Sequence, residues 1–141
     1  MNRLSGLKIV LVLIAIYHVG LGLAGFMSED LTVRVARAVF GLNLNMTPQL
    51  SYIAQLLAVY ALVFGLMVGM VARDPVKHRS LIPIVVILYI LRVLNKFISM
   101  DQFERGFGAS MTKVWTDVAL LAAFGVAVFL LKPKPDSPRE A

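Results

Sequence analysis

The sequence predicts an all-α integral membrane protein: a bundle of four transmembrane helices with a short amphipathic interfacial helix between the first two spans. Hydrophobic residues make up 59% of the chain and charged residues only 16%, whereas soluble domains average about 45–50% and about 25%. The apolar residues fall into four runs, each close to the length of a helix that crosses a bilayer. Lys and Arg residues gather at the ends of these runs. The runs cover about residues 7–27, 50–72, 81–100 and 111–131.

The first apolar run follows two basic residues, Arg3 and Lys8, as the apolar core of a secretory signal does. Signal cores are usually 7–15 residues long, and this run is longer, so we expect it to remain as a membrane span. The chain length suits one compact bundle. We therefore expect residues 1–132 to form a single four-helix membrane domain, and residues 133–141, which are polar and rich in proline, to form a disordered tail.

The segment after the first run has a helical pattern of a different kind. Ser28 or Asp30 can cap a short helix, in which Leu31, Val35 and Val39 recur at helical spacing while Arg34 lies off that face. A helix with one apolar and one charged face lies in the headgroup region of a membrane. We predict an interfacial helix here.

The second run has a clear helix start and a stripe of small residues. Thr47 offers an N-cap oxygen, and Pro48 follows at the first helical position, where its missing N–H costs nothing. Small residues three or four positions apart let transmembrane helices approach closely. The helix-packing stripe consists of Ala54, Ala58, Ala61, Gly65 and Gly69.

The third and fourth runs are joined by a polar segment, residues 101–110, which we predict to be a loop. The basic turn 73–79 lies between the second and third runs, on the same side as both termini. Cytoplasmic loops of membrane proteins carry an excess of Lys and Arg. We therefore place both termini in the cytoplasm of a bacterial cell, with the chain crossing the inner membrane several times.

Each apolar run carries a polar side chain in the half nearer the external helix ends, although lipid cannot solvate such groups. We expect these side chains to turn inward. Asp117 is the only acidic residue well inside a run, so we predict that it pairs with Arg92 or Lys96. The hypothetical ligand- or partner-binding residues are Arg92, Asn95, Lys96, Asp117, His18, Gln55 and Tyr89.

Two other interpretations of these polar residues stay open. A buried network can have a purely structural role. Alternatively, Lys96 reaches the headgroups along its alkyl chain, and Asp117, one turn after Lys113, forms a local surface pair with it.

Several kinds of chemistry have no support in the sequence. The chain has no cysteine and two histidines, so thiolate metal sites, iron–sulfur clusters and a bis-histidine haem within one chain are not expected. No catalytic Ser–His–Asp set or nucleotide-binding loop is present. We expect no enzyme activity, no metal and no cofactor, with a lipid or quinone ligand left open. The basic residues lie at run ends and form no stripe, so nucleic acid is not an expected partner.

The hairpin formed by the second and third apolar runs resembles the BphX-like group of small bacterial four-helix membrane proteins. The resemblance rests on the Ala-Arg-Asp-Pro-Val turn at 72–76, the Arg92-Val-Leu-Asn95-Lys96 block and the Phe107-Gly108 pair. It covers about a third of the chain. The broader DoxX-like group is similar to a lesser degree. Both resemblances imply four membrane helices, and neither implies catalytic residues.

Two functions follow as hypotheses. The first is a non-catalytic accessory, assembly or stabilising subunit of a larger membrane complex or homo-oligomer, suggested by the small-residue stripe and by the lack of catalytic groups. The alternative is a binder or oligomeric transporter of a small amphipathic or anionic molecule, held by the outer-leaflet polar residues. A quinone- or redox-linked subunit is a third option.

Overall fold

A computed structural model describes residues 2–133, and within that range the chain is helical without any strand. Four helices are long and apolar enough to cross a membrane, as the sequence predicts. The elements in order are α1 (Arg3–Met27), α2 (Glu29–Val35), the π-helical turn η1 (Ala36–Phe40), α3 (Pro48–Arg73), the 3₁₀ turn η2 (Arg79–Leu81), α4 (Ile82–Ile98), α5 (Met100–Phe107) and α6 (Met111–Leu131). The predicted tail lies outside the described residues except for Pro133.

Side-chain oxygens define where three of the helices begin. The Thr47 hydroxyl accepts a hydrogen bond from the Leu50 amide at 3.2 Å, with Pro48 in the first turn, as the sequence predicts. Ser28 caps α2 in the same way, and Ser110 caps α6. These bonds satisfy amide groups that have no partner within the helix.

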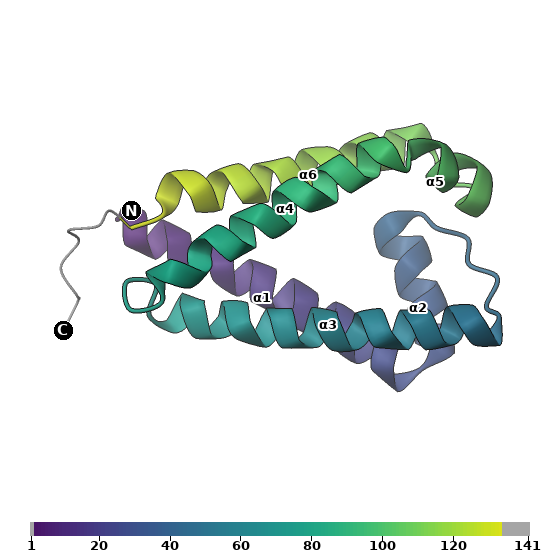
Figure 1. The fold of residues 1–141 in the computed structure, drawn as a ribbon, viewed down its shortest axis with the longest axis horizontal. Coiled ribbons are helices and arrows are strands. Elements are labelled where there is room, and N and C mark those ends of the chain that lie inside the picture. Colours follow the sequence, from purple (N-terminus) through teal and green to yellow (C-terminus); the bar gives the residue numbers. More distant parts are fainter. Residues whose placement is uncertain (1, 134–141) are drawn as a thin grey trace.

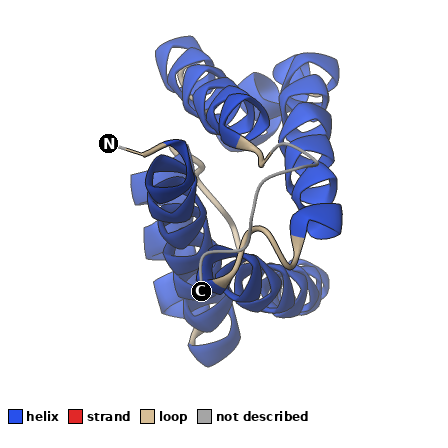
Figure 2. Cartoon of the chain, turned by 90° about the vertical axis from the view of Figure 1, so that its left-hand side faces the viewer, coloured by secondary structure: helices blue, strands red, loops and turns tan. Residues whose placement is uncertain are grey.

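The helices form two pairs. α1 lies beside α3 and α4 lies beside α6. The pairs converge near the N-terminus, where the Arg3 guanidinium donates to the carbonyl of Leu130, and they diverge towards the other end (Figure 1). α2 and η1 lie between the diverging pairs. Figure 2 shows the helices grouped around the middle of the molecule when viewed from the converging end.

Fully buried aliphatic side chains fill the converging half of the bundle. They pack against one another between the two helix pairs and form the hydrophobic core. The largest of them are Leu7, Leu11, Ile14, Val68, Val71, Ile82, Val85 and Val128.

The small-residue stripe of α3 packs against α1. A side chain built on Gly65 would lie 2.7 Å from the backbone nitrogen of Val19, which is closer than carbon atoms come in proteins. Ala58 has the same role, because a side chain on Gly25 would lie 2.7 Å from its Cβ. Close backbone approach is what small residues permit. The stripe thus joins two helices of one chain.

The prediction of a loop at residues 101–110 is wrong for most of that segment. Residues Met100–Phe107 form α5, which ends where Gly108 takes a φ of 61°. Phe103 and Phe107 lie one turn apart with ring centroids 6.2 Å apart, and Asp101 pairs with Arg105 across the opposite side. Apolar and charged faces at helical spacing stabilise a short helix that composition alone does not reveal.

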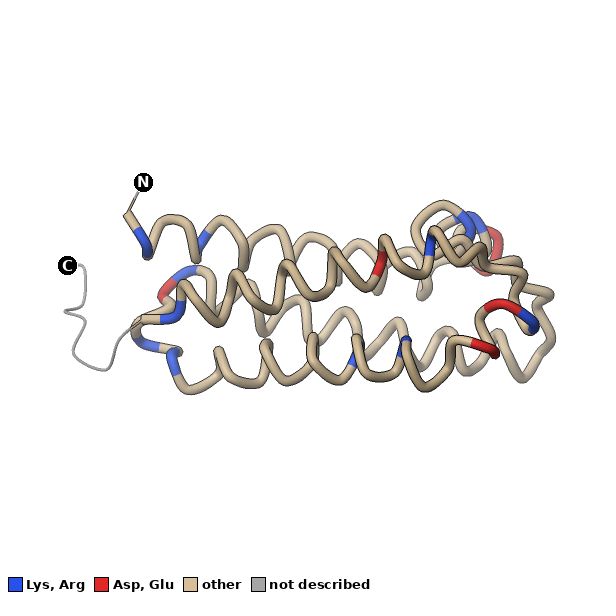
Figure 3. The backbone as a smooth tube through the Cα atoms, turned by 90° about the horizontal axis from the view of Figure 1, so that it is seen from above, with Lys and Arg blue, Asp and Glu red and all other residues tan. Residues whose placement is uncertain are grey.

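Charged residues gather at the two ends of the bundle. Figure 3 shows Lys and Arg dominating the end that holds the N-terminus and the α3–α4 turn, whereas both signs occur at the other end. A few charged residues lie along the helices between the ends. Because such residues are costly in lipid, they mark the part of the molecule to consider for function.

Candidate functional site

A cavity of about 270 Å³ lies in the diverging half of the molecule. Its walls come from α1, η1, α4 and α6, so all but one of the long helices contribute. Most of the lining is aliphatic or aromatic, with four charged side chains among it. The lining residues are Leu13, Ile14, Tyr17, Val39, Phe40, Tyr89, Arg92, Lys96, Lys113, Asp117, Leu120, Leu121 and Phe124.

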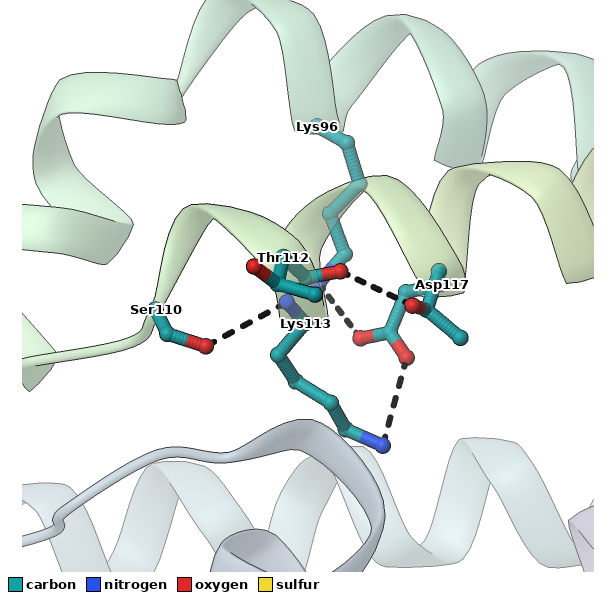
Figure 4. A network of polar contacts seen from close by, with 6 residues as sticks. Lys96, Ser110, Thr112, Lys113 and Asp117 are labelled. Carbon is teal, nitrogen blue, oxygen red and sulfur yellow. Dashed lines mark hydrogen bonds and ion pairs between the residues drawn. The ribbon is translucent and has the colours of Figure 1, made fainter.

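Asp117 of α6 lies between two lysines. Its Oδ2 is 3.3 Å from the Nζ of Lys96 on α4, and its Oδ1 is 3.8 Å from the Nζ of Lys113, one turn earlier on α6. Figure 4 shows the two ammonium groups approaching different carboxylate oxygens. One negative charge is therefore shared by two positive charges.

Lys96 is enclosed by aromatic rings as well as by Asp117. Its ammonium lies 4.1 Å from the ring centroid of Phe103 on α5 and 6.0 Å from that of Phe40 on η1. An aromatic face attracts a cation, and more strongly where water is excluded. Lys96 is therefore buried among contacts within the chain.

Arg92 has a different environment. Its Nη1 lies 3.3 Å from Nε2 of His18, whose Nδ1 lies 2.9 Å from the carbonyl oxygen of Ile14. Because a carbonyl can only accept, Nδ1 carries the proton, and Nε2 of the neutral ring accepts from the guanidinium. Within residues 2–133, no carboxylate oxygen lies within 4 Å of Arg92. The guanidinium thus lines the cavity without a negative partner.

The structure brings together five of the seven residues predicted for the site. Tyr89, Arg92, Lys96 and Asp117 line the cavity, and of the two cations considered for Asp117, Lys96 is the one that pairs with it. His18 is buried directly behind Arg92, between the rings of Tyr17 and Phe64.

Gln55 and Asn95 lie outside the cavity. Gln55 is exposed on α3 and makes no hydrogen bond to a described residue. Asn95 is exposed on α4, and its amide oxygen accepts a hydrogen bond from Ser99 at 3.5 Å. Neither belongs to the network that was expected to include them.

The sequence analysis did not assign Lys113, Tyr17 or Phe40 to the site. The sequence places Lys113 only as a possible surface partner of Asp117. Its i,i+4 spacing to Asp117 signals the contact, but not that the pair borders a cavity. Phe40 enters the cavity because η1 folds back between the helix pairs, which no local pattern predicts.

The arrangement suits recognition of an anion with an apolar body. A guanidinium offers a planar fork of donors to a carboxylate or phosphate, and the aliphatic and aromatic walls exclude water from the rest of a ligand. Among the described residues there is no group of three His, Asp or Glu side chains that could hold a metal.

Comparisons with family models, curated proteins and solved structures gave no match to this chain. The resemblance to the BphX-like group therefore stays a prediction, and the function must be argued from the cavity itself.

Proposed function

We propose that this protein spans the bacterial inner membrane four times and binds a small amphipathic anion in the cavity between α1, η1, α4 and α6. The observation that carries the proposal is Arg92. This cation lines a cavity whose walls are mostly apolar, and unlike Lys96 and Lys113 it has only a neutral histidine as its polar partner in the described chain.

Arg92 is a charged residue within an apolar helix. Placing an arginine at the centre of a membrane helix costs about 2.5–3.5 kcal/mol on insertion scales. For Lys96, the ion pair with Asp117 and the contact with the Phe103 ring offset part of such a cost. For Arg92, a smaller part of the cost is offset, because His18 offers only one uncharged hydrogen-bond acceptor. A bound anion would supply the missing partner through two parallel hydrogen bonds.

The placement of basic residues supports a topology with both termini in the cytoplasm. Lys and Arg dominate the converging end of the bundle, and the cavity lies in the other half, which would be the outer leaflet. A reporter that is active only outside the cytoplasm, fused after Ala141, should be inactive. Activity of that fusion would contradict the proposed orientation.

Binding can be measured with hexanoate as a soluble probe and hexanol as its uncharged counterpart. In nanodiscs, saturation-transfer NMR should detect hexanoate, and not hexanol, on the wild-type protein. Arg92→Leu should reduce the hexanoate signal at least tenfold. Arg105→Leu is the matched control, because Arg105 is exposed on α5 and paired only with Asp101. Equal hexanoate binding by wild type and Arg92→Leu would refute the proposal.

One of the two features that suggested the accessory-subunit hypothesis, the small-residue stripe, is used within the chain. The hypothesis stays a prediction, as does the absence of enzyme activity. A broad apolar face of α3 is exposed, and lipid or another subunit could cover it. Gentle detergent extraction followed by native electrophoresis would distinguish a lipid-covered α3 from one covered by another subunit, since a subunit should migrate together with its partner.

A further inference from the structure

The cavity opens sideways between α1 and α6. Leu13 of α1 and Leu120 of α6 both line it, yet they are 51% and 54% exposed. A residue that lines a cavity while half of its surface is open lies at the rim. We call this opening, between Leu13 and Leu120, the lateral opening.

Both rim residues lie near the middle of their helices. Leu120 is about 13 Å from the start of α6, and Leu13 is about 21 Å from the end of α1, counted from the diverging end of the bundle. A hydrocarbon layer is about 30 Å thick. In the proposed topology the lateral opening therefore faces acyl chains.

The charged residues lie closer to the outer surface than the rim does. By the same count, Lys113 is about 3 Å and Arg92 about 9 Å from the diverging ends of α6 and α4. Between the opening and the surface, Val39 and Phe40 of η1 form part of the cavity wall. Polarity thus falls from the headgroup level towards the bilayer centre, as it does along an amphiphile in the outer leaflet.

The cavity is too small for a long chain. A protein cavity of about 150 Å³ accommodates benzene, so about 270 Å³ accommodates a headgroup and a few carbons. A longer chain would have to continue through the lateral opening into lipid. Towards the converging end, Ile14, Tyr89 and Leu121 belong both to the cavity wall and to the hydrophobic core, so the core lies across this path.

We propose that the ligand is a single-chain carboxylate amphiphile of the fatty-acid type that enters from the bilayer through the lateral opening. Its carboxylate binds Arg92, its first carbons fill the cavity, and the remainder of the chain passes between Leu13 and Leu120 into the outer leaflet. One negative group fits because both lysines already pair with Asp117, so that Arg92 is the one lining cation without an anionic partner among the described residues. This inference rests on the proposed function.

The test uses the full-length protein in phosphatidylcholine nanodiscs and a palmitate analogue with a photoreactive diazirine in mid-chain. Peptide mapping should place the label on α1 and α6 around Leu13 and Leu120. Unlabelled palmitate should compete, whereas methyl palmitate should not. In the double variant Leu13→Trp/Leu120→Trp, labelling should fall at least fivefold, because the indole rings obstruct the lateral opening. Leu57→Trp, on an exposed face of α3 that does not line the cavity, is the control.

The outcomes separate the inference from the proposed function. If hexanoate binds the wild-type protein through Arg92 but the Leu13→Trp/Leu120→Trp variant is labelled as strongly as wild type, the inference is overturned and the binding function stands. Competition by phosphatidylglycerol in place of palmitate overturns the choice of ligand. If wild type binds neither probe, the proposed function itself fails. Circular dichroism and gel filtration of the tryptophan variants establish that they are folded before binding is compared.

Discussion

Lys96 of α4 and Asp117 of α6 form a buried ion pair, with Nζ and Oδ2 3.3 Å apart and side chains only 9% and 11% exposed. The pair joins the two helices that form one wall of the cavity. Removing one partner of such a pair costs more than removing both, because the remaining charge stays buried without compensation. Lys113 makes the two single removals unequal, since it is also 3.8 Å from Asp117.

We therefore expect Asp117→Asn to destabilise the protein by about 3–5 kcal/mol, because it leaves both lysines without their shared anion. Lys96→Met should cost less, since Lys113 still compensates Asp117. The double variant Lys96→Met/Asp117→Leu should be more stable than Asp117→Asn. Unfolding by SDS titration in mixed micelles measures all three. Equal losses for the two single variants would show that Lys113 contributes nothing.

The second prediction concerns the contact between α1 and α3. Gly65→Ala should destabilise the protein by about 1–3 kcal/mol, the usual cost of adding carbon to a tight contact. Its new methyl group would lie 2.7 Å from the Val19 nitrogen and 3.1 Å from the Ala15 oxygen.

Gly69→Ala is the matched control on the same helix. Its methyl group would meet the Cβ of Ala15 at 3.8 Å, an ordinary contact, and alanine favours a helix by about 1 kcal/mol over glycine. This variant should therefore keep or raise stability in the same SDS titration. A Gly65→Ala variant as stable as Gly69→Ala would contradict the close approach of α1 and α3.

Much of the fold follows from the sequence because each span has a strong local signal. The apolar runs set the four long helices, and Thr47 with Pro48 sets the start of α3. The site is only partly predictable. Counting residues gives the depth of a polar side chain, whereas its direction depends on which face the helix packs. Gln55 is one residue, or about 100°, from Ala54 in the stripe that faces α1, so it lies off that face.

Two features could not be predicted because they depend on tertiary structure. Arg92 and Lys96 were equivalent candidates for Asp117. The choice depends on how α4 sits against α6, and on Phe103 of α5, which places a ring beside the Lys96 ammonium. The α5 segment is predicted to be a loop because it is short and polar.

The third prediction tests whether α5 is a helix, using its two neighbouring glycines. Gly108 ends α5 with a φ of 61°, which favours glycine, whereas Gly106 is within the helix with no atom near its missing side chain. Gly108→Ala should lower stability by about 1 kcal/mol. Gly106→Ala should leave it unchanged or raise it. Hydrogen exchange of the α5 amides, compared between the two variants, measures the difference. If the segment were a loop, the two substitutions would have similar effects.

The last prediction concerns His18, which accepts from Arg92 and is 4% exposed. His18→Leu removes the only acceptor that the described chain offers the guanidinium, and because Arg92 is only partly buried the cost should be about 1 kcal/mol, the lower end of the penalty for an unsatisfied donor. In an Arg92→Leu background the same substitution should cost less, because no donor is left unpaired. The difference between the two costs, measured by SDS titration, gives the coupling energy of the pair. A coupling near zero would mean that the bond contributes nothing and that His18 stabilises the bundle only by packing against Phe64 and Tyr17.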